Sequence, residues 1–356
     1  MPNGTETTGR TGWTTGTCAA AAAGAAARVL VGDAMPVRVD LCLPGGECAS
    51  IPVQDVRLTA TGAVATVVKD AGDDPDVTDA ARVEVTLAFR DGGDIEFVAG
   101  VGVGTITKPG LQLPPGEPAI NPVPREMIRD AIRHVTSRAA RVTISIPGGT
   151  ELAEKTFNPR LGIEGGLSIL GTTGIVRPFS AEALRQALTC ALGVACATGH
   201  RELVMVPGNV GRRAAQMHLR VGAEQVVEVS NEWGYMLGSL ADREVTVLMI
   251  VGHPGKLGKL PLGHWNTHSA ASPSALPYVR SLMIRHGGKS VPEAATVGGL
   301  FDGQKPEARR QVGDALADAV RRAVTRRVEG QFAVCVMLVD YQATVLGTAG
   351  DTASWL

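Results

Sequence analysis

Apolar and polar residues alternate with a different period in each half of the chain. In the first half, hydroxyl side chains that can cap a helix precede a run of small residues at 18–31, which predicts a first helix. Short β-rich runs follow, separated by clusters of Gly, Pro and Asp at distances typical of hairpins. These runs lie at 37–43, 53–58, 63–69, 83–89 and 95–98, and a helix at 125–138 and a strand at 142–146 come after them. The pattern predicts an antiparallel sheet accompanied by helices.

After Pro178 the pattern changes to helices that alternate with strongly apolar strands. The predicted strands lie at 203–206, 225–229 and 245–251. The predicted helices lie at 181–198, from 211 onward, and at 232–241, 274–285 and 307–327. Residues 332–339 and 344–346 favour a closing hairpin around 340–343. Alternating elements of this kind predict a parallel α/β layer.

The change of period predicts two domains, 1–178 and 179–356. The first is expected to be an α+β domain with a largely antiparallel sheet and glycine-rich substrate loops. The second is expected to be an α/β domain with a mainly parallel sheet and a cofactor pocket. A length of 356 residues agrees with two domains of about 150 residues each.

Composition and charge exclude several classes of protein. Hydrophobic residues make up 44% of the chain and charged residues 19%, which excludes a disordered protein. Lys and Arg total 34 against 35 Asp and Glu, so no net field attracts nucleic acid or an anionic membrane. We therefore expect neither nucleic acid nor a membrane as a partner, whereas assembly into a homo-oligomer stays open.

The six cysteines indicate a reducing compartment. They form no C-x-x-C pair and match no structural zinc spacing, so we expect reduced thiols and a cytoplasmic protein. The run at 18–30 is mostly alanine, too short and too weakly apolar for a signal peptide or a membrane helix. A soluble protein is expected.

Glycine stands beside hydrogen-bond donors in two segments of the first half. Thr14-Thr15-Gly16-Thr17 precedes the alanine-rich helix and could hold an anion, although an ordinary helix cap explains it more simply. The segment 100–125 combines several glycines with Lys108 and Arg125, which suit a carboxylate or phosphate. A structural turn is the competing interpretation.

Two further segments have the same character. Residues 155–175 place Lys155, Asn158 and Arg160 beside several glycine turns, which suits a multiply anionic ligand, although such cations are usually plain surface charges. In the second half, polar or glycine residues follow three successive strands, at 207–211, 230–232 and 252–259. Ligands of parallel sheets bind at the carboxyl ends of strands, so these segments predict a nucleotide-type pocket. They match neither G-x-G-x-x-G nor a Walker loop.

Metal sites find little support in the sequence. His264 and His268 stand four residues apart, but no H-E-x-x-H motif or acidic ligand cluster accompanies them, so no metal ion is expected. The acidic stretch from Asp70 to Asp76 lacks the spacing of an EF-hand. Asx turns are the simpler interpretation of that stretch.

Taken together, these segments resemble the CbiD family, the cobalt-precorrin-5B C(1)-methyltransferases of corrin-ring biosynthesis. The matching words lie at 11–20, 69–78, 107–110, 116–125, 155–162, 168–175, 207–209, 252–253, 255–257 and 266–269. The resemblance implies transfer of a methyl group from S-adenosylmethionine to C1 of the macrocycle in the oxygen-independent branch of cobalamin synthesis. The family usually has His-Gly after Val77-Thr78, where this chain has Asp79-Ala80.

The resemblance and the residue types together suggest roles within the site. His253 and His268 are the candidates for a proton leaving the ring. Candidates for binding the carboxylated corrinoid substrate are Thr15, Thr17, Lys108, Arg125, Lys155, Asn158, Arg160, Thr172, Thr173, Lys256 and Lys259. Candidates for binding S-adenosylmethionine are Pro207, Gly208, Asn209, Gly211, Asn231, Glu232, Gly252 and Gly255.

Two rival hypotheses remain at this stage. A phosphotransferase would hold a nucleotide at Gly100–Gly104 and magnesium at the acidic stretch. A non-catalytic tetrapyrrole-binding protein would bind the corrinoid without consuming a methyl donor. The absence of a triad or paired-carboxylate signature agrees with methyl transfer, which needs positioning more than a strong nucleophile.

Overall fold

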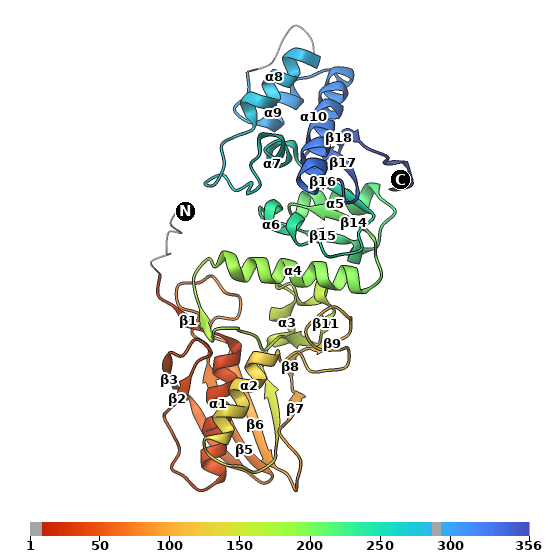
Figure 1. Ribbon diagram of the computed structural model, residues 1–356. Coiled ribbons are helices and arrows are strands. Elements are labelled where there is room, and N and C mark those ends of the chain that lie inside the picture. Colours follow the sequence, from red (N-terminus) through yellow and green to blue (C-terminus); the bar gives the residue numbers. More distant parts are fainter. Residues whose placement is uncertain (1–8, 287–292, 356) are drawn as a thin grey trace. The chain divides into compact units, whose positions relative to one another are not determined.

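A computed structural model describes residues 9–286 and 293–355. The chain forms two compact units, unit 1 (residues 1–181) and unit 2 (residues 182–356) (Figure 1). This division falls three residues after the boundary that we placed at 178/179.

Unit 1 is built around an alanine-rich helix, α1 (Thr15–Leu30). Thr14 caps it, because its Oγ1 accepts a hydrogen bond from the Thr17 backbone N–H at 3.2 Å. Nearly all of α1 is buried, between the large sheet, the strand β2 and the helix α2 (Pro122–Arg133). Side chains no larger than a methyl group allow this close packing on every side of the helix. The helix predicted at 18–31 is thus confirmed, with an earlier start.

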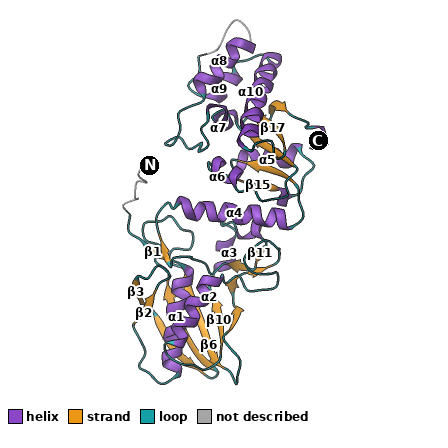
Figure 2. Cartoon of the chain, viewed as in Figure 1, coloured by secondary structure: helices purple, strands orange, loops and turns teal. Residues whose placement is uncertain are grey.

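The main sheet of unit 1 has five strands in the order β4-β5-β6-β10-β7. Figure 2 shows β6 and β10 of this sheet beside α1 and α2. The strands are β4 (Asp55–Thr59), β5 (Gly62–Val68), β6 (Arg82–Phe89), β10 (Ala140–Ser145) and β7 (Glu96–Ala99). All neighbouring pairs are antiparallel except β10 and β7. Buried and less buried residues alternate along β6 and β10, as expected for strands with one face on a core.

Short elements surround this sheet. Paired strands are β1 (Gly12–Trp13) with β13 (Ile175–Val176), β2 (Arg38–Cys42) with β3 (Cys48–Pro52), β8 (Gly102–Val103) with β12 (Gly166–Leu167), and β9 (Thr105–Ile106) with β11 (Ile163–Glu164). The short helices are α3 (Gly149–Ala153) and the 3₁₀ helix η1 (Asn158–Leu161). Most of these pairs join segments that are distant in sequence. The pair of β1 and β13, for example, joins Gly12 to Val176.

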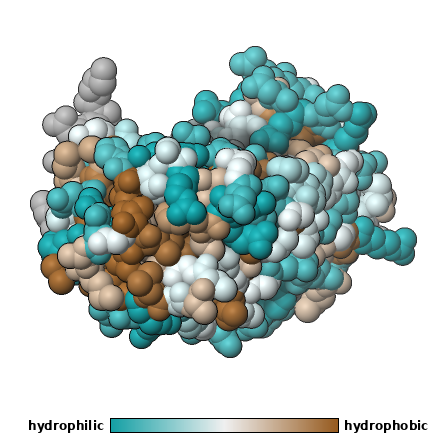
Figure 3. All heavy atoms as spheres, turned by 90° about the horizontal axis from the view of Figure 1, so that it is seen from below, coloured by the Kyte–Doolittle hydropathy of each residue, from teal (hydrophilic) through white to brown (hydrophobic). Residues whose placement is uncertain are grey.

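The far end of α1 carries an exposed hydrophobic surface. Its large side chains are Val31, Met35, Val37 and Leu58. Figure 3 views this end of unit 1 and shows hydrophobic side chains gathered in one area. A 16-residue helix is about 24 Å long, so this surface is well separated from the amino end of α1.

Unit 2 contains a five-stranded sheet in the order β15-β14-β16-β17-β18. The strands are β14 (Glu202–Val206), β15 (Val226–Glu228), β16 (Val247–Gly252), β17 (Ala333–Val339) and β18 (Val345–Ala349). Only the last pair is antiparallel. β14, β16 and β17 are buried on both faces, which explains their unbroken apolar sequences.

Helices connect and cover these strands. They are α4 (Ala181–Ala197), α5 (Asn209–His218), α6 (Trp233–Gly238), α7 (Pro254–Leu257), α8 (Leu276–His286), α9 (Val297–Asp302) and α10 (Pro306–Arg327). Three 3₁₀ helices, η2 (Ala223–Gln225), η3 (Leu260–Leu262) and η4 (Ala353–Trp355), complete the unit. Within the described residues, no helix is long and apolar enough to cross a membrane.

The predicted fold class is confirmed in both units: an α+β unit with a largely antiparallel sheet and an α/β unit with a mainly parallel sheet. Several short elements were not predicted, β3 and α9 among them. The strand β3 follows a short glycine turn and contains Ser and Pro, which weaken a strand pattern. The helix α9 is only six residues long and includes two glycines, so no helical period is visible in it.

Candidate functional site

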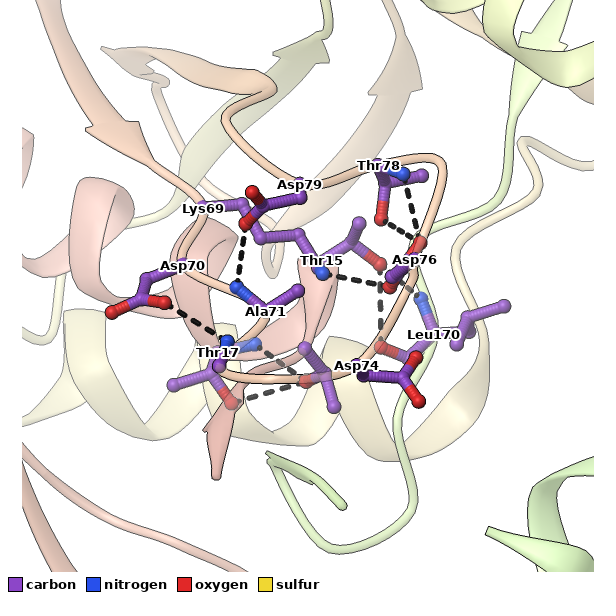
Figure 4. Close-up of polar contacts among 12 residues, drawn as sticks. Thr15, Thr17, Lys69, Asp70, Ala71, Asp74, Asp76, Thr78, Asp79 and Leu170 are labelled. Atoms are coloured by element: carbon purple, nitrogen blue, oxygen red, sulfur yellow. Dashed lines mark hydrogen bonds and ion pairs between the residues drawn. The ribbon is translucent and has the colours of Figure 1, made fainter. Parts of the chain in front are cut away.

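Three of the matching words meet at the amino end of α1 in unit 1. We call residues 14–17, 69–79 and 168–174 the motif cluster (Figure 4). The Thr15 Oγ1 accepts a hydrogen bond from the Leu170 N–H at 2.9 Å. The Thr17 Oγ1 donates to the Gly174 carbonyl at 2.6 Å. Both threonines are buried, so their hydroxyls hold the 168–174 segment against the helix.

The loop at 69–79 joins β5 to β6 and is organised by a buried lysine. The Lys69 Nζ lies 2.8 Å from the Asp76 Oδ2, and the Lys69 side chain is only 1% exposed. The other Asp76 oxygen accepts from the backbone and the hydroxyl of Thr78, at 2.8 and 2.7 Å. The loop is thus tied together by an ion pair that is shielded from water.

The electrostatics of this loop favour the charged carboxylate. Burial by itself would raise the pKa of Asp76, but hydrogen bonds from Lys69 and Thr78 outweigh it, and the pKa is lowered. Nearby, burial raises the pKa of the Cys18 thiol to about 12. Cys18 is therefore a neutral packing residue at physiological pH.

The acidic stretch forms Asx turns, as we expected. The Asp70 carboxylate accepts from the Gly72 N–H at 2.9 Å, and Asp76 does the same for Thr78. Asp79 reaches across the loop to accept from the Ala71 N–H at 2.8 Å. Among the described residues, no group of three or more His, Cys, Asp or Glu side chains is arranged to hold a metal ion.

Asp79-Ala80 occupies the place where the family usually has His-Gly. Ala80 has a φ of +58°, in the left-handed region that glycine adopts without strain. Ala80 therefore adopts a backbone conformation that a glycine would adopt with less strain.

Two candidate substrate residues of unit 1 are held in hydrogen bonds within the protein. Asn158 is buried, donates to the Gly166 carbonyl at 3.1 Å and accepts from the Ser168 hydroxyl at 3.0 Å. Arg125 donates to the Ile120 carbonyl at 2.8 Å and forms an ion pair with Glu117 at 2.8 Å. These side chains shape the loops from inside.

The remaining candidates of unit 1 lie at its surface. Lys155, Arg160, Thr172 and Thr173 are exposed, and Lys108 is partly exposed. The Lys108 stem packs over Gly162, where an added Cβ would lie 2.4 Å from the Lys108 Cγ. Lys108 and Arg160 therefore come from segments that lie side by side, as β9 and β11 are paired.

The glycines of 100–104 serve close packing of the backbone. A Cβ on Gly100 would lie 2.1 Å from the Ser145 Oγ, and one on Gly102 would lie 2.0 Å from the Ile146 carbonyl oxygen. The backbone N–H groups of Gly100 and Gly104 already donate to the carbonyls of Ile144 and Leu167, so they are not available to cradle a phosphate. This loop therefore gives no support to the phosphotransferase hypothesis.

In unit 2, the strand order places β14 between β15 and β16. The connections after β14 and β16 therefore leave in opposite directions, one toward β15 and the other toward β17, which creates the crevice where open α/β sheets bind ligands. Pro207 and Gly208 follow β14, and Gly252 ends β16. Gly211 lets α5 approach the sheet, since a Cβ there would lie 2.5 Å from the Val251 carbonyl oxygen.

Three charged residues stand at this edge of the sheet. Glu228 is the last residue of β15, and its Oε2 lies 3.4 Å from an Arg212 nitrogen at the start of α5. Lys256, on α7, is half-buried, and burial lowers the pKa of its ammonium against the smaller opposing effect of Glu228. In the described part of the chain, no hydrogen bond or ion pair engages the Lys256 side chain.

The second strand-end segment is tied into the fold. Glu232 is buried, and its two oxygens accept from Arg185 at 2.7 Å and Asn266 at 2.9 Å. The Asn231 side chain accepts from the Thr267 hydroxyl at 3.1 Å. Lys259 is 7% exposed and donates to the Thr267 carbonyl and twice to Ser272. These contacts fix the 266–269 segment against α6.

The two candidate histidines differ in their surroundings. The Nδ1 of His253 accepts from the Gly255 N–H at 3.0 Å, and its ring stacks on Tyr341 with centroids 4.2 Å apart. Burial lowers the pKa of His253, and the smaller effects of Asp340 and Asp302 oppose it. Because Nδ1 accepts from Gly255, the neutral form of His253 carries its proton on Nε2. His268 is exposed, and its Nδ1 accepts from the Ala270 N–H at 3.2 Å.

A mainly parallel α/β sheet with a polar crevice where its strand order reverses is the architecture typical of proteins that bind nucleotide-like small molecules. A sequence model of the CbiD family matches residues 3–178. A cobalt-precorrin-5B C(1)-methyltransferase of Syntrophotalea carbinolica is 51% identical over 97% of this chain and 98% of its own. Its namesake from Moorella thermoacetica is 40% identical over 95% of this chain and 94% of its own. The chain belongs to the CbiD family.

A crystal structure of the cobalamin biosynthesis protein CbiD from Archaeoglobus fulgidus was also found. It covers 74% of this chain and 83% of its own at 26% identity, with a TM-score of 0.41. The relatives' names describe C-methyltransferases, so this chain is a member of a family of enzymes.

Lys69 and Glu228 were not among the site residues that we predicted from the sequence, and Asp76 was considered only as part of a magnesium site. Lysine is usually exposed, and nothing in the local pattern shows that Lys69 enters the interior. Glu228 could have been found, because it ends a predicted strand of a parallel sheet.

Proposed function

We propose that this protein transfers the methyl group of S-adenosylmethionine to C1 of cobalt-precorrin-5B in cobalamin biosynthesis. The observation that carries the proposal is the identity of 51% to a cobalt-precorrin-5B C(1)-methyltransferase over nearly the whole length of both chains. The crevice of unit 2 supports a nucleoside-bearing donor. We also place the protein in the cytoplasm, the compartment in which its six free thiols would persist.

The residues of unit 2 fit the donor. Gly208 has a φ of +154°, and Gly252 could not carry a Cβ, which would lie 2.9 Å from Pro207. Backbone without side chains therefore borders the crevice, and Asn209 is exposed beside it. S-adenosylmethionine supplies a methyl group that is already activated on a sulfonium. The chain must then bind both ligands, exclude water and align the ring carbon about 3–3.5 Å from the methyl group.

The surface cations suit the carboxylates of a corrinoid substrate. Lys155, Arg160 and Lys108 in unit 1 and Lys256 in unit 2 present charges at or near the surface. Thr172 and Thr173 add exposed hydroxyls on the 168–174 segment. Other candidates form hydrogen bonds with the backbone of the loops, and their role is to position those loops. They are Arg125, Asn158, Thr15, Thr17 and Lys259.

His268 is better placed than His253 to take up a proton released from the ring. Both histidines accept a backbone N–H at Nδ1, from Gly255 and from Ala270, but His268 is exposed to solvent whereas His253 is partly buried. Single-turnover methylation by His268→Ala should be slowed by about 100-fold or more, and His253→Ala should retain more activity. Unchanged rates in both variants would exclude His253 and His268 as the proton acceptor.

The proposed function is tested by incubation with cobalt-precorrin-5B and S-adenosylmethionine labelled in its methyl group. We expect one label at C1 of the macrocycle and one equivalent of S-adenosylhomocysteine. A corrinoid that binds without consuming the donor would instead establish a binding protein. Label at another ring carbon would assign a different methylation.

A further inference from the structure

Glu228 occupies a distinctive position in the crevice of unit 2. It ends β15, the strand next to β14, and it faces the bend that follows β14. A Cβ placed on Gly208 in that bend would lie 3.9 Å from the Glu228 Oε1, so the carboxylate points toward the glycine. The carboxylate follows the bend by about 20 residues, the spacing at which parallel α/β folds place an acidic residue on a ribose.

Basic side chains lie on two sides of the partly exposed Glu228 carboxylate. Arg212 lies 3.4 Å away on one side, and the electrostatic influence of Glu228 extends to Lys256 on another. The Glu228 side chain is 19% exposed, so it is shielded from bulk water without being sealed inside the protein. An ionised carboxylate only accepts hydrogen bonds, and two neighbouring hydroxyls of a ribose are well matched donors.

Glu232, which the sequence suggested for this role, is less suited to it. Both of its oxygens already accept hydrogen bonds from Arg185 and Asn266, and the residue is 7% exposed. A ligand would have to break a buried ion pair to reach it.

We propose that the Glu228 carboxylate binds the 2′- and 3′-hydroxyls of the ribose of an adenosyl ligand at the crevice of unit 2. The inference rests on the proposed function for the identity of that ligand, the methyl donor. A ribose diol is also present in ATP, so the test compares both sources.

Calorimetric titration of the full chain with S-adenosylhomocysteine, with its 2′-deoxy analogue and with ATP tests the proposal. We expect Glu228→Gln to weaken binding of S-adenosylhomocysteine by about 10- to 100-fold. The deoxy analogue should bind the unmutated chain more weakly than S-adenosylhomocysteine does, and Glu228→Gln should reduce that difference. Glu202→Gln is the matched control, because Glu202 is exposed at the opposite end of the sheet and should leave binding unchanged.

Three results would overturn the proposal. The first is equal binding of S-adenosylhomocysteine by the unmutated chain and Glu228→Gln. The second is equal binding of the deoxy analogue and the parent compound by the unmutated chain, a comparison that needs no substitution. The third is binding of ATP alone or of neither nucleoside, which would also reject the donor named in the proposed function. If the unmutated chain binds S-adenosylhomocysteine but the first or the second result is found, the role of Glu228 fails and the proposed function stands.

Discussion

Lys69 in unit 1 and Lys256 in unit 2 show how differently the two units use the residues of their matching words. Lys69 is 1% exposed and lies 2.8 Å from Asp76, so its charge is balanced inside the fold. Lys256 is half-buried without a hydrogen bond or ion pair in the described part of the chain. In unit 1 the polar residues mainly build loops, whereas at the crevice of unit 2 a charge stays available to a ligand. Substitutions in unit 1 should therefore change stability first, and those in unit 2 should change binding first.

The largest expected effect is that of Asp76→Asn. Removing the carboxylate leaves a buried ammonium without its anion, which should lower the free energy of unfolding by about 3–5 kcal/mol. Urea unfolding measures the change. Asp91→Asn, at an exposed position, is the control and should change it little. A loss below about 1 kcal/mol would mean that the pair is not the internal support that distinguishes unit 1.

The same pair predicts a dependence on pH. The pKa of Asp76 is lowered in the folded protein, so its stabilising contribution is complete above the ordinary range of an aspartate. That contribution is lost as the pH falls through the lowered pKa, because the unfolded chain then binds the proton more readily. Unfolding experiments between about pH 6 and pH 2.5 should show a smaller loss for Asp76→Asn than for the unmutated chain.

Gly171→Ala should also reduce stability, by roughly 2–4 kcal/mol. Gly171 has a φ of +133°, and an added Cβ would lie 2.4 Å from the Thr14 Oγ1. Gly165→Ala separates the two causes, since Gly165 has a φ of +85° with open space around it. The control should lose only about 1 kcal/mol. Equal losses in the two variants would show that contact with the helix cap is unimportant.

In unit 2, Lys256→Met should raise the KM for the corrinoid by about tenfold with little change in stability. Lys305→Met, at an exposed position before α10, is the control. Because burial lowers the pKa of Lys256, its charge is lost at a lower pH than that of an ordinary lysine. The alkaline decline of kcat/KM should move to higher pH in Lys256→Arg. An unchanged KM in Lys256→Met would show that Lys256 does not bind the corrinoid. Lys256 and Lys69 would then no longer differ in that one binds a ligand and the other stabilises the fold.

The smallest effect is expected from Ala80→Gly. This change relieves the strain of the left-handed conformation of Ala80. The greater freedom of glycine in the unfolded chain offsets part of that gain, so the free energy of unfolding should rise by about 0.5–1 kcal/mol. Ala81→Gly, at the adjacent buried position, should be destabilising. Thermal unfolding of the two variants gives the comparison directly.

The fold was predictable because each unit has its own period of apolar residues. The alternating strands of unit 1 and the unbroken apolar strands of unit 2 indicated an antiparallel and a parallel sheet. The site was less predictable, because its contacts join distant positions: Thr15 meets Leu170 across 155 residues. The same limit hid the burial of Lys69. The burial of the Glu232 carboxylate also depends on tertiary partners, because Arg185 and Asn266 come from distant parts of the chain.

The alanine-rich helix α1 has a consequence for how the chain tolerates change. Its residues from Cys18 to Ala23 and from Ala25 to Ala27 have no exposed surface. Gly24 leaves 3.3 Å between a hypothetical Cβ and Val39, so one methyl group already makes a tight contact. In a library of random single variants selected for folding, residues 18–27 should admit little besides exchanges among Ala, Gly, Ser and Cys. In such a library, residues 18–27 would form a segment with few accepted substitutions between two segments that accept many.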